Sequence, residues 1–222
     1  TGSGNGPTGG TLGTVTGSET KNTTVKDSLG NQVVVPAGFK VVNKDANVTD
    51  GIVVEDVSHS ATAGSQFVWI PVGDVIKDSA GNKETITLGR YVFNEDGSVN
   101  TELSKTEPGD QLKTSSSASN YFTEGLKDST TSNTHAKDIE DFKNKVNNIT
   151  HGYYIGRYEA GKENNVAVVK QKQVPYTNIK WSQAYALAKE IDVGSKATSY
   201  LCSSYAWDTA IKFIQTHSTA TN

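Results

Sequence analysis

The segment of residues 151–217 constrains the fold more than any other part of the chain. It contains two of the three Trp residues, most of the Tyr residues and the single Cys. Residues 153–159 are aromatic and β-prone, which predicts a strand. Apolar side chains then recur at helical spacing over residues 181–191 and again after Ser203 or Ser204, which predicts two amphipathic helices. A strand followed by two helices indicates an α+β domain.

Short β-strands are expected to dominate the chain upstream of this segment. Four segments combine Val, Ile, Phe or Trp with bounding Gly, Asn, Asp or Pro residues. The expected strands are residues 32–35, 39–42, 51–57 and 66–72. Because Gly, Asn and Asp turns separate these strands, they indicate hairpins rather than βαβ units.

Composition divides the chain into three parts. Residues 1–24 are rich in Gly, Thr and Ser and have almost nothing to bury, so we expect a flexible linker or an assembly tail. Residues 25–65 form an N-terminal β region. Residues 66–222 form the remaining part, in which residues 74–150 are a long insertion. The apolar content of 34% is low, so some of the chain is expected to be tail or surface loop.

The insertion is expected to be mostly polar loop. The elements expected within it are a strand at residues 85–93, a loop at residues 98–134 and a short helix at residues 135–146 with Thr134 as its N-cap. Tyr121 and Phe122 are an aromatic pair in otherwise polar sequence. These two residues are therefore the candidates for an exposed contact with a partner.

Four ordered segments resemble motifs of one protein family. They are residues 67–73 (FVWIPVG), 152–159 (GYYIGRYE), 174–184 (VPYTNIKWSQA) and 200–208 (YLCSSYAWD). Together they are similar to the formylglycine-generating-enzyme (sulfatase-modifying-factor) superfamily, whose fold is a variant of the C-type-lectin fold. Residues 25–42 and 203–211 resemble clostridial surface proteins with prepilin-like N-termini. The resemblance implies an α+β chain: an N-terminal β region followed by a C-type-lectin-like domain with a long insertion.

The resemblance covers residues 66–216 and implies that the lectin-type domain is incomplete. The family's later half, with its G-N-V-W-E-W and R-G-G-S-W motifs, has no counterpart before Asn222. In the enzymes of the family, that half supplies central strands, the catalytic cysteines and the metal ligands. No catalytic, cofactor-binding or metal-binding residue can therefore be transferred to this chain. We expect either a truncated chain or strands that are supplied from elsewhere.

Few side chains form a pattern that predicts chemistry. Cys202 and His217 could pair as nucleophile and base, but the predicted helix between them, with roughly 1.5 Å rise per residue, places them at opposite ends. We expect Cys202 to be a small core residue instead. The four His residues are scattered without metal-ligand spacing, so neither a metal site nor a cofactor is predicted.

One polar turn partly resembles a calcium-binding loop. It contains Asp45, Asn47, Asp50 and Gly51, but the spacing differs by one residue from that of an EF-hand and the closing Glu is missing. A polar turn is the interpretation that we favour. Ca²⁺ remains the alternative, because calcium is known in the resembled superfamily.

The aromatic residues of the last third are expected to form core rather than to line a ligand groove. They are Tyr153, Tyr154, Tyr158, Trp181, Tyr185 and Trp207. In the second predicted helix, the spacing predicts that Trp207, Ala210, Ile211 and Ile214 form the buried face.

Charge and composition narrow the function classes. The net charge of −3 without a basic patch does not indicate nucleic-acid binding, and no apolar run reaches the ~20 residues of a membrane-spanning helix. Abundant Thr, Ser, Asn and Gly with one Cys and no Met suits a protein exported from a Gram-positive type of cell. We therefore expect a non-enzymatic extracellular or cell-surface protein that presents a lectin-type scaffold for adhesion to a protein or glycan.

Two other functions stay open. The chain could be a structural subunit of an extracellular filament or pilus-like appendage, which binds neighbouring copies of itself. The Gly/Thr-rich tract and the missing sheet strands motivate this alternative, because a neighbour could supply a strand. An oxidoreductase of the formylglycine-generating type is the least supported function, because the family's catalytic half is absent.

Overall fold

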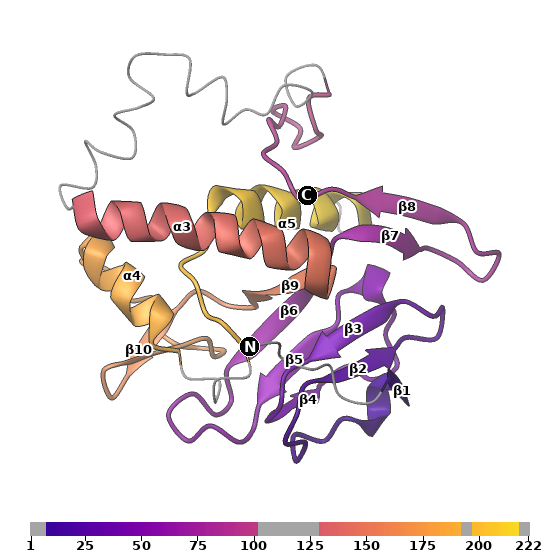
Figure 1. Cartoon of the computed structure of the whole chain (residues 1–222), viewed down its shortest axis with the longest axis horizontal. Helices are drawn as coiled ribbons and strands as arrows, with labels where there is room; N and C mark the ends of the chain where they lie inside the picture. Colours follow the sequence, from indigo (N-terminus) through magenta and orange to yellow (C-terminus); the bar gives the residue numbers. More distant parts are fainter. Residues whose placement is uncertain (1–7, 102–128, 192–196, 218–222) are drawn as a thin grey trace.

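A four-stranded antiparallel sheet in the order β4-β5-β6-β9 organises the structure. The computed structural model describes residues 8–101, 129–191 and 197–217, and in these residues it contains four small sheets and three α-helices (Figure 1). The strands of the main sheet are β4 (Phe39–Val41), β5 (Val53–Asp56), β6 (Gln66–Pro71) and β9 (Gly152–Gly156). The boundary expected after residue 65 therefore falls between two paired strands of one sheet.

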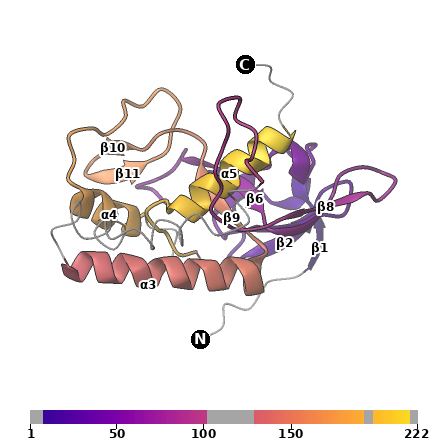
Figure 2. The ribbon, with the colours of Figure 1, turned by 90° about the horizontal axis from the view of Figure 1, so that it is seen from above.

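The two faces of the main sheet pack against different elements, because successive side chains of a strand point to opposite faces. Tyr154 lies on one face beside Trp69, and its hydroxyl donates a 3.1 Å hydrogen bond to the carbonyl of Val34 in the N-terminal sheet. Tyr153 lies on the opposite face, and its hydroxyl donates a 2.6 Å bond to the carbonyl of Ala206 in helix α5 (Ser204–His217). Figure 2 shows α5 lying over β6 and β9, with α3 alongside.

The N-terminal sheet contains part of the tract that composition predicts to be a flexible linker. Its elements are β1 (Thr8–Thr11), the 3-10 turn η1 (Leu12–Thr14), β2 (Thr23–Lys26) and β3 (Gln32–Val35). Strand β1 pairs in parallel with β2, and Leu12 and Val15 are buried in the core. The linker prediction is therefore wrong for the described residues 8–24, because two apolar side chains anchor a tract that is otherwise polar.

A hairpin of β7 (Gly73–Ile76) and β8 (Lys83–Ile86) follows the main sheet. The strand expected at residues 85–93 already ends at Ile86. Beyond it, the backbone N–H groups of Gly89 and Tyr91 donate to Thr209 and Asp208 of α5 instead of to a strand. The expected insertion also contributes to the core, since Val75 and Ile86 are buried in the same cluster as the main sheet.

Helix α3 (Ser129–Lys145) starts earlier than the sequence predicts and continues into the π-helical turn η4 (Val146–Thr150). Thr134 is inside this helix, so it is not the N-cap. The apolar periodicity begins only at Ile139, and the first turns, STTSNT, contain Ser, Thr and Asn, which favour caps over helix interiors. Pattern analysis therefore could not detect them.

The last third of the chain contains the two helices that the spacing predicts. Its elements are β10 (Gly161–Glu163), β11 (Val166–Val168), α4 (Trp181–Lys189) and α5. The hydroxyl of Ser203 accepts a 3.2 Å bond from the N–H of Ala206, which identifies Ser203 as the N-cap of α5. Within the described residues, no helix is long and apolar enough to cross a membrane.

Candidate binding surface around Trp207

Helix α5 buries Ala206, Ala210 and Phe213 and leaves Trp207 and Ile214 exposed. Trp207 and Ile214 are 57% and 55% exposed, so the expected buried face is wrong for these two residues, whereas Ala210 is buried and Ile211 is half-buried. Two sets of apolar residues follow the spacing i, i+4 and i+7 on this helix: residues 206, 210 and 213, and residues 207, 211 and 214. Because the spacing is the same, it cannot tell which set packs against the sheet. The Ala residues let the helix approach Tyr153 closely, as the 2.6 Å bond to the Ala206 carbonyl shows.

An apolar groove of about 180 Å³ lies between the exposed stripe of α5 and the main sheet. Its apolar lining consists of Val68, Ile70, Ile155, Trp207, Ile211 and Ile214. On the sheet side, the groove is lined by the row of Val68 and Ile155, which lies next to the row of Ile70 and Tyr153 on the same face. One exposed Trp is common on protein surfaces, whereas an exposed Trp beside an apolar groove is typical of an interaction site.

The row of the sheet that contains Val68 and Ile155 is apolar across β5, β6 and β9. The register places Val53 beside Val68 and Val68 beside Ile155. At the edge, the N–H of Val42 donates a 2.8 Å bond to the carbonyl of Val53, which extends the row by one residue. Val42 is 41% exposed. Because Val53 is only 8% exposed, the accessible part of this row lies at the half-buried Val68 and Ile155, which line the groove beside the helix.

The next row of the same face is polar and its side chains are linked to one another. Lys40 pairs with Glu55 at 2.9 Å, and the Gln66 amide donates to Glu55 at 2.7 Å. Arg157 donates from Nη1 to the Gln66 side-chain oxygen at 2.8 Å. Its guanidinium also lies 5.5 Å from the ring of Tyr158. Among the described residues, Arg157 forms no ion pair, so a cation stands at the rim of the apolar groove.

A second hollow, of about 370 Å³, lies on the other side of Trp207 and is polar. Arg90 and Asp208 form an ion pair there with 2.7 Å between Nε and Oδ2, and the N–H of Tyr91 donates to the same carboxylate oxygen at 3.0 Å. Cys202 lines this hollow and as a whole residue is exposed rather than buried as expected, although its Sγ is partly enclosed and donates to the Ser203 carbonyl at 3.7 Å. Burial of its thiol, and secondarily the negative charge of Asp208, raise the pKa of Cys202 to about 11. The thiol therefore stays protonated at neutral pH and is a weak nucleophile.

His217 is not a partner for this thiol. It is the last residue of α5, whereas Cys202 precedes the helix, so the two lie at its opposite ends as the sequence predicts. The imidazole Nε2 instead forms an ion-pair contact with the carboxylate of Glu84 in β8. This contact ties the end of α5 to the β7–β8 hairpin and has a structural role.

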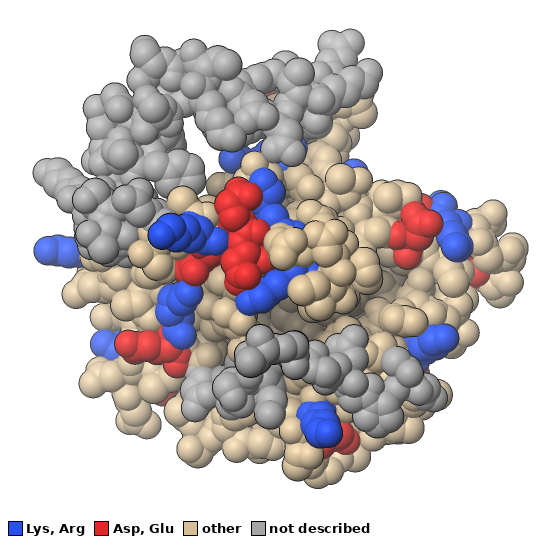
Figure 3. Space-filling view, in the orientation of Figure 1, with Lys and Arg blue, Asp and Glu red and all other residues tan. Residues whose placement is uncertain are grey.

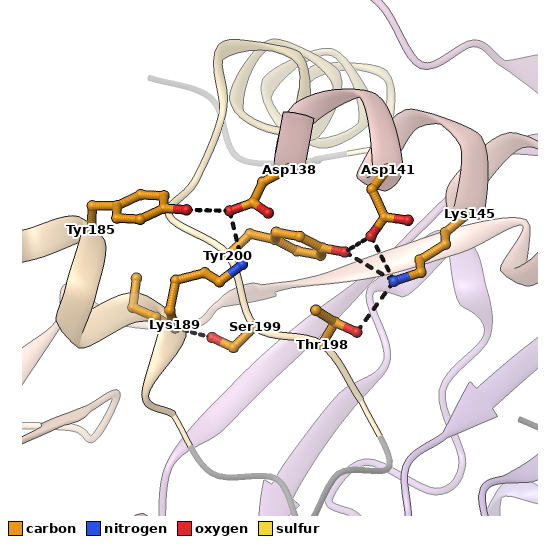
Figure 4. Close-up of polar contacts among 9 residues, drawn as sticks. Asp138, Asp141, Lys145, Tyr185, Lys189, Thr198, Ser199 and Tyr200 are labelled. Carbon is orange, nitrogen blue, oxygen red and sulfur yellow. Dashed lines mark hydrogen bonds and ion pairs between the residues drawn. The ribbon is translucent and has the colours of Figure 1, made fainter. Parts of the chain in front are cut away.

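A cluster of ionisable side chains joins α3, α4 and the segment before α5 (Figure 4). Asp138 accepts bonds from the Tyr185 hydroxyl at 2.5 Å and from Lys189 at 2.8 Å. Asp141 accepts from Lys145 at 2.6 Å and from the Tyr200 hydroxyl. The helix α3 region in Figure 3 accordingly shows acidic and basic side chains next to one another. Since each carboxylate is already bonded to a Lys and a Tyr, we interpret this cluster as a clamp between helices and not as a binding site.

One buried histidine lies beside the clamp. His135 is 6% exposed and contacts the rings of Trp181 and Tyr185 at centroid distances of 5.4 and 5.5 Å. Burial lowers the pKa of His135; the Asp138 charge opposes this shift and the Lys189 charge adds to it. No described group bonds to Nδ1 of this buried ring, and the ring fills the space between α3 and α4 as a neutral aromatic group.

The turn that resembles a calcium loop uses its oxygens as helix caps. Asn47 and Asp50 form a capping box around the 3-10 turn η2 (Val48–Asp50), with the N–H of Asn47 donating to Asp50 at 2.8 Å. The Asn47 side-chain oxygen also accepts a 2.6 Å bond from Ser28. These bonds engage the side-chain oxygens of Asn47 and Asp50 within the turn, and the absence of a Ca²⁺ site stays a prediction. Tyr121 and Phe122, which the sequence analysis names as candidates for contact with a partner, lie outside the described residues.

Comparison with known proteins identifies no relative. No protein-family model matches the chain, and no curated protein or solved structure is similar to it. The surface around Trp207, which the sequence assigned to the core, is thus the feature from which a function can be inferred.

Proposed function

We propose that the chain is a non-enzymatic extracellular or cell-surface protein that binds a protein partner through the surface around Trp207. The observation that carries this proposal is the 57% exposure of Trp207 between an apolar groove and a polar hollow. Trp and Arg are the residue types enriched among those that dominate binding energy, and such residues cluster at pockets that a partner can fill. Binding would remove the exposed surfaces of Trp207 and Ile214 from water, which favours association.

The chemistry of the two hollows favours binding over catalysis. Cys202 carries the single thiol of the chain and lines the polar hollow with Trp207. Its pKa of about 11 leaves it protonated at neutral pH. The carboxylate of Asp208 is held by Arg90 and by the backbone of Tyr91. Neither group is therefore poised to attack or deprotonate a substrate.

The resemblance to the lectin-type scaffold is part of the proposal. It is supported by the order of the elements: β6 and β9 pair as antiparallel neighbours, and α4 and α5 follow at the segments where the resemblance predicts them. On this scaffold, α5 and one face of the main sheet would present the binding surface.

The filament alternative loses part of its support. Its motives were the Gly/Thr-rich tract and the missing sheet strands, which a neighbouring copy could supply. Strand β1 of this tract pairs with β2 of the same chain instead. Self-association is therefore kept as an outcome of the test below and is not proposed.

Biolayer interferometry against immobilised extracellular proteins tests the proposal. The panel consists of fibronectin, laminin, collagen and mucin, with the chain itself as a fifth surface. We expect a saturable interaction with at least one of the first four. Trp207→Ala should weaken it at least tenfold, because truncation of a central Trp typically costs about 2 kcal/mol or more.

Val174→Ala is the matched control. Val174 is 81% exposed and apolar but does not line either hollow of the Trp207 surface, so its truncation should leave affinity within about twofold. Absence of binding to all four proteins, or equal loss in both variants, would contradict the proposal. Saturable binding only to the immobilised chain would favour the filament alternative.

A further inference from the structure

We propose that the partner segment in the groove is extended and carries an apolar side chain and a carboxylate two residues apart. This inference rests on the proposed function and specifies the chemistry of the partner at the same site. The apolar side chain would fill the space beside Trp207, and the carboxylate would pair with Arg157 at the rim.

The charge of Arg157 is the first reason for a carboxylate. The polar row of the sheet contains two cations, Lys40 and Arg157, but only one carboxylate, Glu55. A hydrogen bond from Lys40 is the main cause that lowers the pKa of Glu55, with a further bond from Gln66, so this carboxylate is ionised and already engaged. Arg157 therefore keeps an uncompensated positive charge.

The position of Arg157 is fixed before any partner arrives. Its Nη1 is bonded to Gln66, and its backbone N–H donates a 3.0 Å bond to the Gln66 carbonyl. Within the described residues, the remaining guanidinium donors have no hydrogen-bond partner and are placed to bind a carboxylate in the planar geometry that Arg favours. A side chain that is already held loses less conformational entropy on binding.

The spacing between the apolar and charged features follows from strand geometry. Ile155 on β9 and Arg157 just after its end are two residues apart and point to the same face. Same-face neighbours on a strand are separated by about 6.6–6.8 Å. An extended partner segment has the same repeat, so an apolar side chain over Ile155 places the side chain two residues along over Arg157.

Synthetic peptides provide the probe, and the indole of Trp207 provides the signal. The chain is labelled with 5-fluorotryptophan, and the ¹⁹F resonance of Trp207 is assigned by its loss in Trp207→Phe. Three peptides are titrated: Gly-Ser-Leu-Ser-Asp-Ser-Gly, its Asn analogue and its Lys analogue, all with blocked ends. Trp69 is 2% exposed and serves as the internal reference.

We expect the Asp peptide to bind about three- to fivefold more tightly than the Asn peptide, as is typical of an ion pair at a partly exposed site. The preference should shrink at high salt. Arg157→Gln should abolish it, and Arg157→Glu should transfer it to the Lys peptide. Circular dichroism and thermal unfolding establish that these variants are folded.

The possible failures are distinguishable. If the Trp207 resonance moves equally for the Asp, Asn and Lys peptides, the groove binds apolar segments but the carboxylate inference is wrong. If no peptide moves this resonance, the inference is also overturned, while the interferometry panel still decides whether the Trp207 surface binds folded proteins.

Discussion

The side chain of Asn31 hydrogen-bonds to both backbone groups of Ile76. Its Oδ1 accepts from the Ile76 N–H at 2.7 Å, and its Nδ2 donates to the Ile76 carbonyl at 2.9 Å. Asn31 thus occupies the edge of β7 as a neighbouring strand would. This contact docks the β2–β3 hairpin on the β7–β8 hairpin, although 45 residues separate the two partners.

The same five-residue loop, D-S-x-G-N, closes both hairpins. In the first, the N–H and the Nδ2 of Asn31 donate to the two carboxylate oxygens of Asp27 at 2.8 and 2.9 Å. In the second, Asn82 donates to Asp78 in the same way at 3.1 and 2.8 Å. In the first loop Asp27 and Asn31 are buried, and Asn31 bonds to β7, whereas the second loop is exposed to solvent. Comparing Asn31 with Asn82 therefore separates the stability that comes from bonding to Ile76 from the stability that comes from the turn itself.

We predict that Asn31→Ala lowers the free energy of unfolding by about 2–3 kcal/mol, because it removes three side-chain hydrogen bonds at a buried position. Asn82→Ala should cost no more than about 0.5 kcal/mol, since only its bond to exposed Asp78 is lost. Urea unfolding monitored by fluorescence measures both. Equal losses would mean that the turn, and not the docking on Ile76, provides the stability.

Gly152→Ala is predicted to destabilise the chain by about 1–3 kcal/mol through overpacking. A Cβ at this position would lie 2.1 Å from the indole ring of Trp69, which is buried and cannot move aside without disturbing the core. Gly13→Ala is the control, because its Cβ would meet only Lys44 side-chain atoms at 3.6 Å or more. Thermal unfolding of the two variants should separate them, and a neutral Gly152→Ala would show that Trp69 packs differently.

Stability is predicted to fall in mild acid because of His135. Burial lowers the pKa of His135 in the folded chain below its ordinary value of 6.5, so the unfolded chain takes up the proton first. The contribution is complete above pH 6.5 and is lost as the pH falls from there through the lowered folded-state pKa. His135→Phe should make stability less dependent on pH in this window in urea titrations. An unchanged pH dependence would exclude His135 as the cause.

Cys202 is predicted to react slowly with iodoacetamide at pH 7–8 despite its exposure. Its pKa of about 11 keeps the thiolate fraction small, so the rate should keep rising up to that pH. Asp208→Asn should shift the rate profile to lower pH, because the carboxylate contributes to the raised pKa. A rate that reaches its plateau near pH 8.5 would contradict this environment of the thiol.

Sequence analysis predicted the elements with strong local signals. The strands expected at residues 32–35 and 66–72 are present as β3 and β6, where β-branched or aromatic residues end at Pro36 and near Pro71. The helices α4 and α5 follow the predicted apolar spacing. Each of these signals lies within one short segment, so no tertiary information was needed.

The Trp207 surface could not be predicted in this way. The buried and exposed stripes of α5 have the same spacing, and the larger side chains of the exposed stripe suggested the wrong face. The apolar row that lines the groove belongs to β5, β6 and β9, and its members Val53 and Ile155 are about 100 residues apart in the sequence. Only the register of the folded sheet brings them together.

The central claim is that the Trp207 indole is exposed to solvent beside an apolar groove. The solvent isotope shift of its ¹⁹F resonance tests this claim most directly, because the measurement needs no partner. In the free chain labelled with 5-fluorotryptophan, we expect exchange of H₂O for D₂O to shift the resonance of Trp207, which is 57% exposed, and to leave that of Trp69, which is 2% exposed, almost unchanged. A Trp207 shift as small as that of Trp69 would show that this indole is buried, and would contradict both the open groove and the function proposed for it.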